Sequence, residues 1–143
     1  MIRILAVGRL KDHRLAELAA EYIKRARPWR RIEVVELKDS GIEKEGREMV
    51  RWLDANPAGR IVACDENGAE TTSRGLSELL GSHGSLTFLI GGPDGLGAEA
   101  KKRADQSLAL SRLTMTHEMA RMLLTEQIYR GLAILRGHHY HRD

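Results

Sequence analysis

The end of the chain, from Gly137 to Asp143, gathers several side chains that could do chemistry: His138, His139, Tyr140, His141 and Arg142. A metal site is one interpretation because imidazole is the commonest transition-metal ligand, although no histidine and carboxylate stand at a zinc-type spacing. A disordered terminus is a second interpretation. We favour a third, RNA recognition, because aromatic rings stack on unpaired bases and cationic groups bind phosphates.

A glycine-rich loop, Gly91 to Gly97 (GGPDGLG), directly follows the apolar run Leu86–Ile90. Glycines allow a backbone to approach a ligand closely. The loop lacks the Lys-Ser/Thr pair of a P-loop and the glycine spacing of a dinucleotide-binding turn. It is therefore either a structural turn or a ligand site of another kind. Open parallel sheets bind ligands beyond the carboxyl ends of their strands, and this loop stands at such an end.

Cys64 ends another apolar run, and no histidine is near it in the sequence. We expect a small apolar filler there rather than a nucleophile. A single cysteine, no signal segment and no apolar stretch of membrane-spanning length predict a cytoplasmic protein that has no membrane partner.

Charged residues pose two further questions. Arg121, Glu126 and Arg130 lie in an otherwise apolar final helix, where they must be paired or face a ligand. Cations also bunch around the end of the first helix, at Lys24, Arg25, Arg27, Arg30 and Arg31. That cluster is either an RNA-binding patch or a solvated surface that complements the helix dipole. The net charge of +3 is compatible with both.

The elements that must position these residues alternate along 143 residues, a length typical of one domain, which we expect to span residues 1–143. Hydrophobic periodicity predicts strands at 3–8, 31–38, 60–65, 86–90 and 108–115, with a turn at 66–68. It predicts helices at 10–27, 42–55, 73–80, 98–106 and 117–135. This alternation indicates an α/β fold, a mostly parallel sheet with flanking helices.

The final helix, for which Thr116 is the expected N-cap, has apolar residues around most of its circumference. Such a helix needs burial on more than one side. The simplest solution is a second copy of itself, so we predict a two-fold dimer; a deeply buried core helix is the alternative.

Taken together, several segments resemble the RlmH family of ribosomal RNA large subunit methyltransferases. They are Ile4–Gly8 (ILAVG), Leu89–Leu96 (LIGGPDGL), Leu110–Thr114 (LSRLT), His117, Arg121, Glu126, Tyr129–Arg130 and Tyr140–Arg142 (YHR). The resemblance implies a SPOUT-type α/β fold with a C-terminal trefoil knot, working as a homodimer. It implies S-adenosyl-L-methionine as methyl donor, no metal, and N3 of a pseudouridine in 23S rRNA of the assembled ribosome as acceptor.

Carried over by position, the cofactor-binding residues implied are Cys64, Gly91, Leu110, Ser111, Arg112, Leu113, Thr114 and Met115. The expected substrate-binding residues are Arg130, Tyr140, His141 and Arg142. Methyl transfer needs no covalent intermediate, so positioning and electrostatics can suffice. His141 and Tyr140 are candidates for a general base, and solvent is the alternative. We expect the tail to close over a cofactor pocket, its own or its partner's.

The sequence is also compatible with two rival functions. One is a non-catalytic RNA-binding or ribosome-associated dimer that keeps the fold without methyl transfer. The other is a SPOUT methyltransferase that acts on tRNA.

Overall fold

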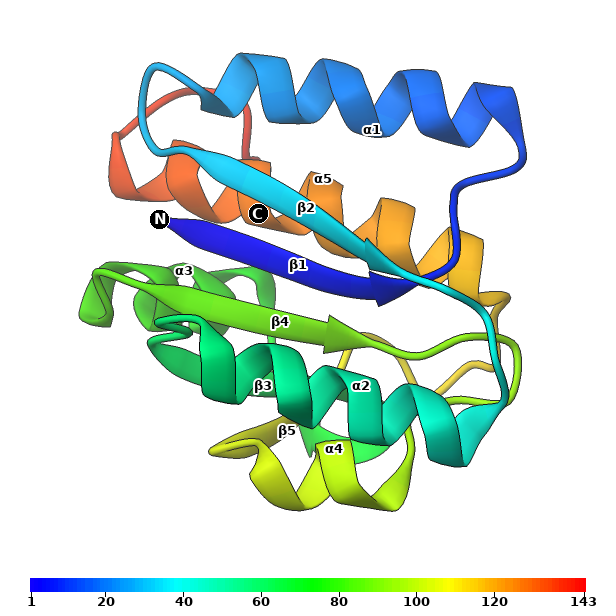
Figure 1. Cartoon of the computed structure of the whole chain (residues 1–143). Helices are drawn as coiled ribbons and strands as arrows, with labels where there is room; N and C mark the ends of the chain where they lie inside the picture. Colours follow the sequence, from blue (N-terminus) through cyan, green and yellow to red (C-terminus); the bar gives the residue numbers. More distant parts are fainter.

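Five strands and five helices alternate along the chain in the computed structural model, which describes residues 1–143 (Figure 1). The strands are β1 (Ile2–Val7), β2 (Ile32–Leu37), β3 (Arg60–Glu70), β4 (Leu86–Ile90) and β5 (Gln106–Ala109). The helices are α1 (His13–Ala26), α2 (Ile42–Ala55), α3 (Ser73–Ser82), α4 (Ala98–Arg103) and α5 (His117–Leu135).

All strands belong to one parallel sheet with the order β2-β1-β4-β3-β5. The predicted α/β class is therefore confirmed. β4 occupies the middle of the sheet, and each of its five residues is buried, as its continuous apolar sequence predicted. Because the strands are parallel, their carboxyl ends share one edge, where the glycine loop leaves β4.

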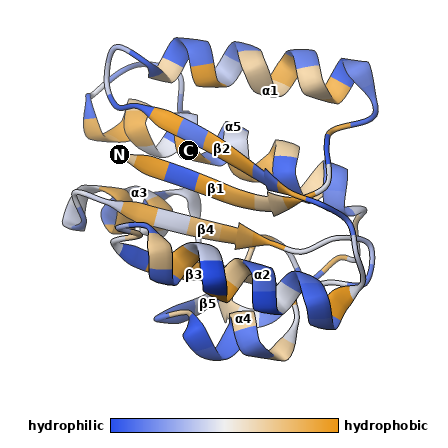
Figure 2. Cartoon of the chain, viewed as in Figure 1, coloured by the Kyte–Doolittle hydropathy of each residue, from blue (hydrophilic) through white to orange (hydrophobic).

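Helices cover both faces of the sheet (Figure 1). Successive strand residues point to opposite faces, so Ile4 and Phe88 pack with α1, α3 and α5, whereas Leu5 and Leu89 pack with α2 and α4. Figure 2 shows the hydrophobic strands between helices that carry hydrophilic residues on their outer sides. The two apolar layers anchor the strand ends that form the site.

The predicted fifth strand, residues 108–115, is wrong in its position. β5 covers only Gln106–Ala109, and α4 ends at Arg103 rather than at residue 106. From Leu110 onward, local polar bonds replace the sheet ladder: the Ser111 hydroxyl accepts a hydrogen bond from the Leu113 N–H, and Arg112 binds the Glu66 carbonyl oxygen. Residues 110–116 are thus an irregular segment.

The turn predicted at residues 66–68 is instead an irregularity within β3. The register shifts so that both Cys64 and Ala69 stand opposite Leu108. Gly68 permits this close approach, since a Cβ there would lie 2.7 Å from the Leu108 backbone nitrogen. The bulge lets β3 continue while residues between the two paired positions leave the ladder.

The final helix begins where expected, and the Thr116 hydroxyl caps it by accepting a hydrogen bond from the Met119 N–H at 3.2 Å. α5 packs against both α1 and α3, so the chain itself buries much of its apolar circumference. The expected dimer stays a prediction. Its support is no longer the apolar circumference of α5, but the large apolar side chains that remain exposed on the chain. Strand order does not define how the chain threads, so the trefoil knot also stays a prediction.

Candidate active site

A cavity of about 910 Å³ opens beyond the carboxyl ends of β3 and β4. Its walls come from the glycine loop, the bulge of β3, the segment after β5 and the first turns of α1 and α5. This is the edge at which open parallel sheets bind their ligands, and the volume suits a small organic molecule.

The glycine loop folds back tightly on itself at this cavity. The Gly95 N–H donates to the Gly92 carbonyl at 3.0 Å, and Gly95 has a φ of +87°. A Cβ on Gly91 would lie 2.2 Å from the Gly95 carbonyl carbon. Only glycine fits at residue 91, because the chain passes so close to itself. The loop is thus a constrained turn whose residues line the cavity.

The structure brings most of the expected cofactor residues to this cavity. Those that line it are Cys64, Gly91, Leu110, Ser111, Leu113, Thr114 and Met115. Arg112 does not line it. Its Nε donates to a carboxylate oxygen of Glu70 at 2.9 Å and its Nη1 to the Glu66 carbonyl at 2.6 Å. Arg112 therefore holds the segment after β5 against β3.

Cys64 reaches the cavity from the end of the regular part of β3. Burial raises the pKa of its thiol to about 12, so the thiol is protonated at neutral pH. The structure thus agrees with the filler interpretation and gives no support to a nucleophile.

Carboxylates outnumber cations around the cavity, which the sequence analysis missed. Its acidic lining residues are Asp12, Asp65, Glu66, Asp94 and Glu118, and its basic ones are Lys101 and His117. Burial alone would raise the pKa of Asp65, but the Asn67 N–H and the Lys101 ammonium, 3.1 Å away, outweigh it and lower that pKa. The remaining negative charge favours a ligand that carries positive charge.

Asp12 and Glu118 stand far apart in the sequence, and tertiary structure joins them: the Asp12 N–H donates to Glu118 Oε1 at 3.1 Å. The guanidinium of Arg14 holds the pKa of Asp12 well below its usual range. No local pattern in the sequence could have assigned these two carboxylates to one cavity.

A second group of functional candidates is assembled around Glu126 on α5. Glu126 Oε1 accepts hydrogen bonds from Arg130 Nη2 at 2.6 Å and from the Tyr140 hydroxyl at 2.8 Å. Arg130 Nη1 lies 3.1 Å from His141 Nδ1, and its guanidinium carbon lies 4.8 Å from the centre of the Tyr140 ring. Three of the four expected substrate residues are therefore in contact, and the tail is folded onto α5 rather than frayed.

The last residues continue this network. His141 Nε2 lies 2.9 Å from Asp143 Oδ1, and Arg74 Nε donates to the same oxygen at 3.0 Å. Arg74 and His141 together lower the pKa of Asp143 to about 2. Arg142, the fourth expected substrate residue, is exposed and makes no ion pair, so it is free to contact a ligand.

Tyr140 is a hydrogen-bond donor in this arrangement. Burial, together with the Tyr22 hydroxyl and the Glu126 carboxylate, raises the pKa of its phenol above the ordinary value. A phenol that stays protonated does not serve as a general base at neutral pH.

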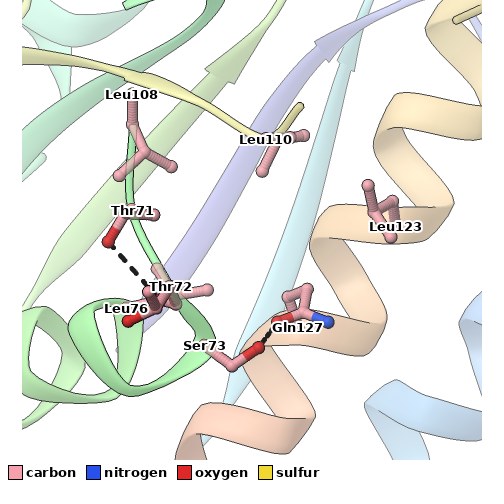
Figure 3. Close-up of a pocket in the computed structure, with 8 residues that line it drawn as sticks. All are labelled: Thr71, Thr72, Ser73, Leu76, Leu108, Leu110, Leu123 and Gln127. Carbon is pink, nitrogen blue, oxygen red and sulfur yellow. Dashed lines mark hydrogen bonds between the residues drawn. The ribbon is translucent and has the colours of Figure 1, made fainter. Parts of the chain in front are cut away.

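The tail and the large cavity do not meet within one chain, because none of Tyr140, His141 and Arg142 lines it. A smaller cavity of about 170 Å³ lies between α3, β5 and α5 (Figure 3). Its hydroxyl groups already have partners, as where Ser73 donates to Gln127 Oε1 at 2.6 Å. We regard the smaller cavity as a packing feature.

Two general features of the chain complete the description. No three histidine, cysteine, aspartate or glutamate side chains converge in a way that would hold a metal ion. None of the helices is long and apolar enough to cross a lipid bilayer.

Comparison with known proteins identifies the family. The family model described as "Predicted SPOUT methyltransferase" matches residues 1–141. Ribosomal RNA large subunit methyltransferase H from Synechococcus sp. (strain RCC307) is 48% identical over 144 residues, covering 99% of this chain and 95% of that protein. The protein of the same name from Caldicellulosiruptor bescii is 37% identical over 156 residues, covering 99% of this chain and 100% of that protein.

A solved structure supports the fold alone. The crystal structure of TrmJ from Z. mobilis ZM4 superposes with a TM-score of 0.58 at 9% sequence identity, covering 91% of this chain and 69% of that one. The full-length matches establish more than this likeness does: the chain belongs to the SPOUT methyltransferase family, in its ribosomal RNA large subunit methyltransferase H group.

Proposed function

We propose that the chain is an S-adenosyl-L-methionine-dependent methyltransferase that methylates N3 of a pseudouridine in 23S rRNA of the assembled ribosome. One observation carries the proposal: the cavity at the carboxyl ends of β3 and β4 gathers the glycine loop, Cys64 and the segment after β5. The relatives' name, ribosomal RNA large subunit methyltransferase H, supports the choice of substrate. Such a substrate fits a cytoplasmic protein.

The cavity suits the proposed methyl donor in size and chemistry. Apolar side chains such as Leu110 and Met115 can cover an adenine ring, while backbone groups of residues 91–96 can bind polar edges. Of the implied set, we assign cofactor contacts to Cys64, Gly91, Leu110, Ser111, Leu113, Thr114 and Met115, and a supporting role to Arg112. Bound there, S-adenosylmethionine supplies an electrophilic methyl group on a positively charged sulfonium. The excess of carboxylates around the cavity favours that charge.

The tail residues bind the RNA rather than remove its proton. Arg130 Nη1 donates to His141 Nδ1, so the imidazole carries its proton on Nε2, which donates to Asp143. Both ring nitrogens of His141 are thus engaged, and Tyr140 keeps its proton. Solvent then remains as the acceptor of the N3 proton in this arrangement. Arg130 and Arg142 stabilise the negative charge that develops on the base.

We further propose a homodimer in which the tail of one subunit serves the cavity of its partner. The separation of the tail from its own cavity supports this arrangement. So do large apolar side chains of the cavity lining that are exposed: Leu113 (77%) and Met119 (48%). Burying such side chains in a second copy would stabilise a dimer.

Transfer of labelled methyl groups from S-adenosylmethionine tests the function. The substrates are intact ribosomes that lack the modification, free large subunits and bulk tRNA, each with wild type and with a variant lacking residues 138–143. We expect label in 23S rRNA of intact ribosomes only, and its loss in the truncated variant, with cofactor binding retained.

Each other result points to a different protein. Label in tRNA would keep the methyltransferase and replace its substrate. No label anywhere, together with no cofactor binding by calorimetry, would indicate a non-catalytic RNA-binding protein. Full activity without residues 138–143 would refute the role of the tail.

A further inference from the structure

Tertiary structure extends the cation cluster at the end of α1. Lys24, Arg27 and Arg31 are exposed around the turn between α1 and β2. Arg136, at the end of α5, joins them because its Nη2 donates to the Trp29 carbonyl at 3.3 Å. The cluster therefore combines segments that are more than one hundred residues apart in the sequence.

None of these four cations takes part in an ion pair. The carboxylates nearby are already engaged, since Glu21 binds Arg25 and Glu33 binds Arg3. Arg30 differs from its neighbours because it turns inward and donates to the carbonyls of Leu80 and His83. The exposed cations thus keep their charge available to an outside partner.

Two imidazole rings lie beside the cations. His138 packs against Trp29 with ring centres 5.3 Å apart, and His139 stacks on His138 at 4.4 Å with an interplanar angle of 23°. Both histidines are exposed. We call this surface the basic end; it comprises Lys24, Arg27, Arg31, Arg136, His138 and His139.

The basic end is separate from the cavity within the chain. Figure 1 shows the loop between α1 and β2 beside the segment after α5, at the end of the molecule away from the strand arrowheads. The same region carries hydrophilic residues in Figure 2. None of its six residues lines the large cavity. They therefore do not contact a cofactor bound in the cavity of their own chain.

We propose that the basic end is a second RNA-contacting surface, which binds the phosphate backbone of structured rRNA outside the target nucleotide. This inference rests on the proposed function. Unpaired lysines and arginines bind phosphates and release counterions, and such contacts set the orientation of the protein on its substrate. The exposed imidazoles of the basic end add hydrogen-bond donors for the same phosphates and flat rings on which RNA bases can stack.

The test removes charge from this surface and, as a control, from the opposite face of the sheet. The first variant carries Arg27→Gln, Arg31→Gln and Arg136→Gln. The control carries Arg47→Gln, Arg51→Gln and Lys102→Gln, which lose the same charge from exposed positions on α2 and α4. Methyl transfer to intact ribosomes is measured at several salt concentrations, together with S-adenosylmethionine affinity and the melting temperature.

For the basic-end variant we expect KM for ribosomes to rise roughly tenfold, and the slope of log KM against log salt to fall by about 2 to 3. The kcat, the cofactor affinity and the melting temperature should stay within twofold or a few degrees of wild type. The control should show wild-type KM.

Two results would overturn the inference. One is an unchanged KM and salt slope in the basic-end variant, and the other is an equal change of KM and salt slope in the control variant. In both cases, activity of the wild-type protein on ribosomes leaves the proposed function standing. A wild-type protein that transfers no methyl group to rRNA would instead refute the proposed function, and the inference with it.

Discussion

Glu126 is the residue on which the carboxyl-terminal site is built. Its Oε1 accepts hydrogen bonds from Arg130 and from the Tyr140 hydroxyl, while its Oε2 accepts one from Gln127 at 2.8 Å. The hydrogen bond from Arg130 raises the pKa of that guanidinium. Because charge-assisted hydrogen bonds fix geometry, one carboxylate sets the positions of a cation and a phenol that we assign to RNA binding.

Tyr140→Phe tests whether the phenol takes a proton during catalysis. The variant keeps the edge-to-face contact of Tyr140 with Tyr129, whose ring centre is 4.7 Å away, and removes only the hydroxyl. Because the raised pKa keeps the phenol protonated, we expect methyl transfer to fall by less than about tenfold and stability by about 1 kcal/mol.

Transfer rates between pH 6 and 9 and urea unfolding measure both effects. Loss of a general base would instead lower the rate by roughly 10²- to 10⁴-fold. If the transfer rate of the variant fell by that much and its pH–rate profile lost a titration that the wild type shows, the assignment of Tyr140 as a hydrogen-bond donor would be contradicted.

Cys64 should resist alkylation in the folded protein. With its pKa at about 12, the thiolate fraction at pH 8 is roughly a thousandfold below that of an ordinary cysteine thiol, and it rises as pH increases. We expect iodoacetamide to label native protein at least about a hundredfold more slowly than urea-unfolded protein, by mass spectrometry. Rapid labelling of the native protein at pH 8 would show that this thiol is not desolvated.

At the scale of elements, the cavity depends on two irregularities at neighbouring strands. The bulge in β3 turns residues 65–67 toward the cavity, and the loop after β4 folds back on itself. Each irregularity requires a glycine, Gly68 against β5 and Gly91 against Gly95. Regular strands could not present so much backbone to a ligand, because the sheet ladder would occupy it.

Gly91→Ala is therefore expected to weaken cofactor binding at least about tenfold and to lower stability by about 1–3 kcal/mol, since the added Cβ overlaps the Gly95 carbonyl. Calorimetric titration with S-adenosylmethionine and thermal unfolding measure the two effects. Gly84→Ala is the matched control, because a Cβ there meets nothing within 4 Å and the φ of Gly84 lies outside the left-handed region. Equal behaviour of the two variants would disprove a special requirement at residue 91.

At the scale of the whole molecule, we propose that the cavity and the tail are two incomplete parts of one site. The tail is held on its own chain by Glu126, Arg130 and Arg74, and it leaves its own cavity open. A second copy can complete both cavities by one two-fold operation. The exposed Leu113 and Met119 at the cavity rim give such a contact apolar area.

Mixed dimers test this exchange of tails. A Gly91→Ala chain binds the cofactor weakly, and a chain without residues 138–143 lacks a tail, so each homodimer should have little activity at a low S-adenosylmethionine concentration. Random pairing of the two makes half of the dimers mixed, each with one complete site, and should restore about a quarter of wild-type activity. Purified chains are refolded together and assayed on ribosomes. No recovery from a mixture that forms mixed dimers by native mass spectrometry would contradict exchange.

The sequence by itself determined the elements whose cause is local. β4 and α2 keep their predicted bounds, and Thr116 caps α5, because apolar periodicity and a capping hydroxyl act within a few residues. The sequence also indicated which loops follow the carboxyl ends of strands, and most residues of these loops line the cavity.

Only the tertiary structure decided where β5 ends, that Arg112 turns to Glu70, and that Asp12 meets Glu118. It also decided which carboxylate accepts the hydrogen bond of the Tyr140 hydroxyl and to which loop Arg136 donates a hydrogen bond. Each of these depends on strand register and on helix packing between segments distant in sequence. Hydrophobic periodicity specifies which face of an element is buried, and leaves open which distant side chain that element will meet.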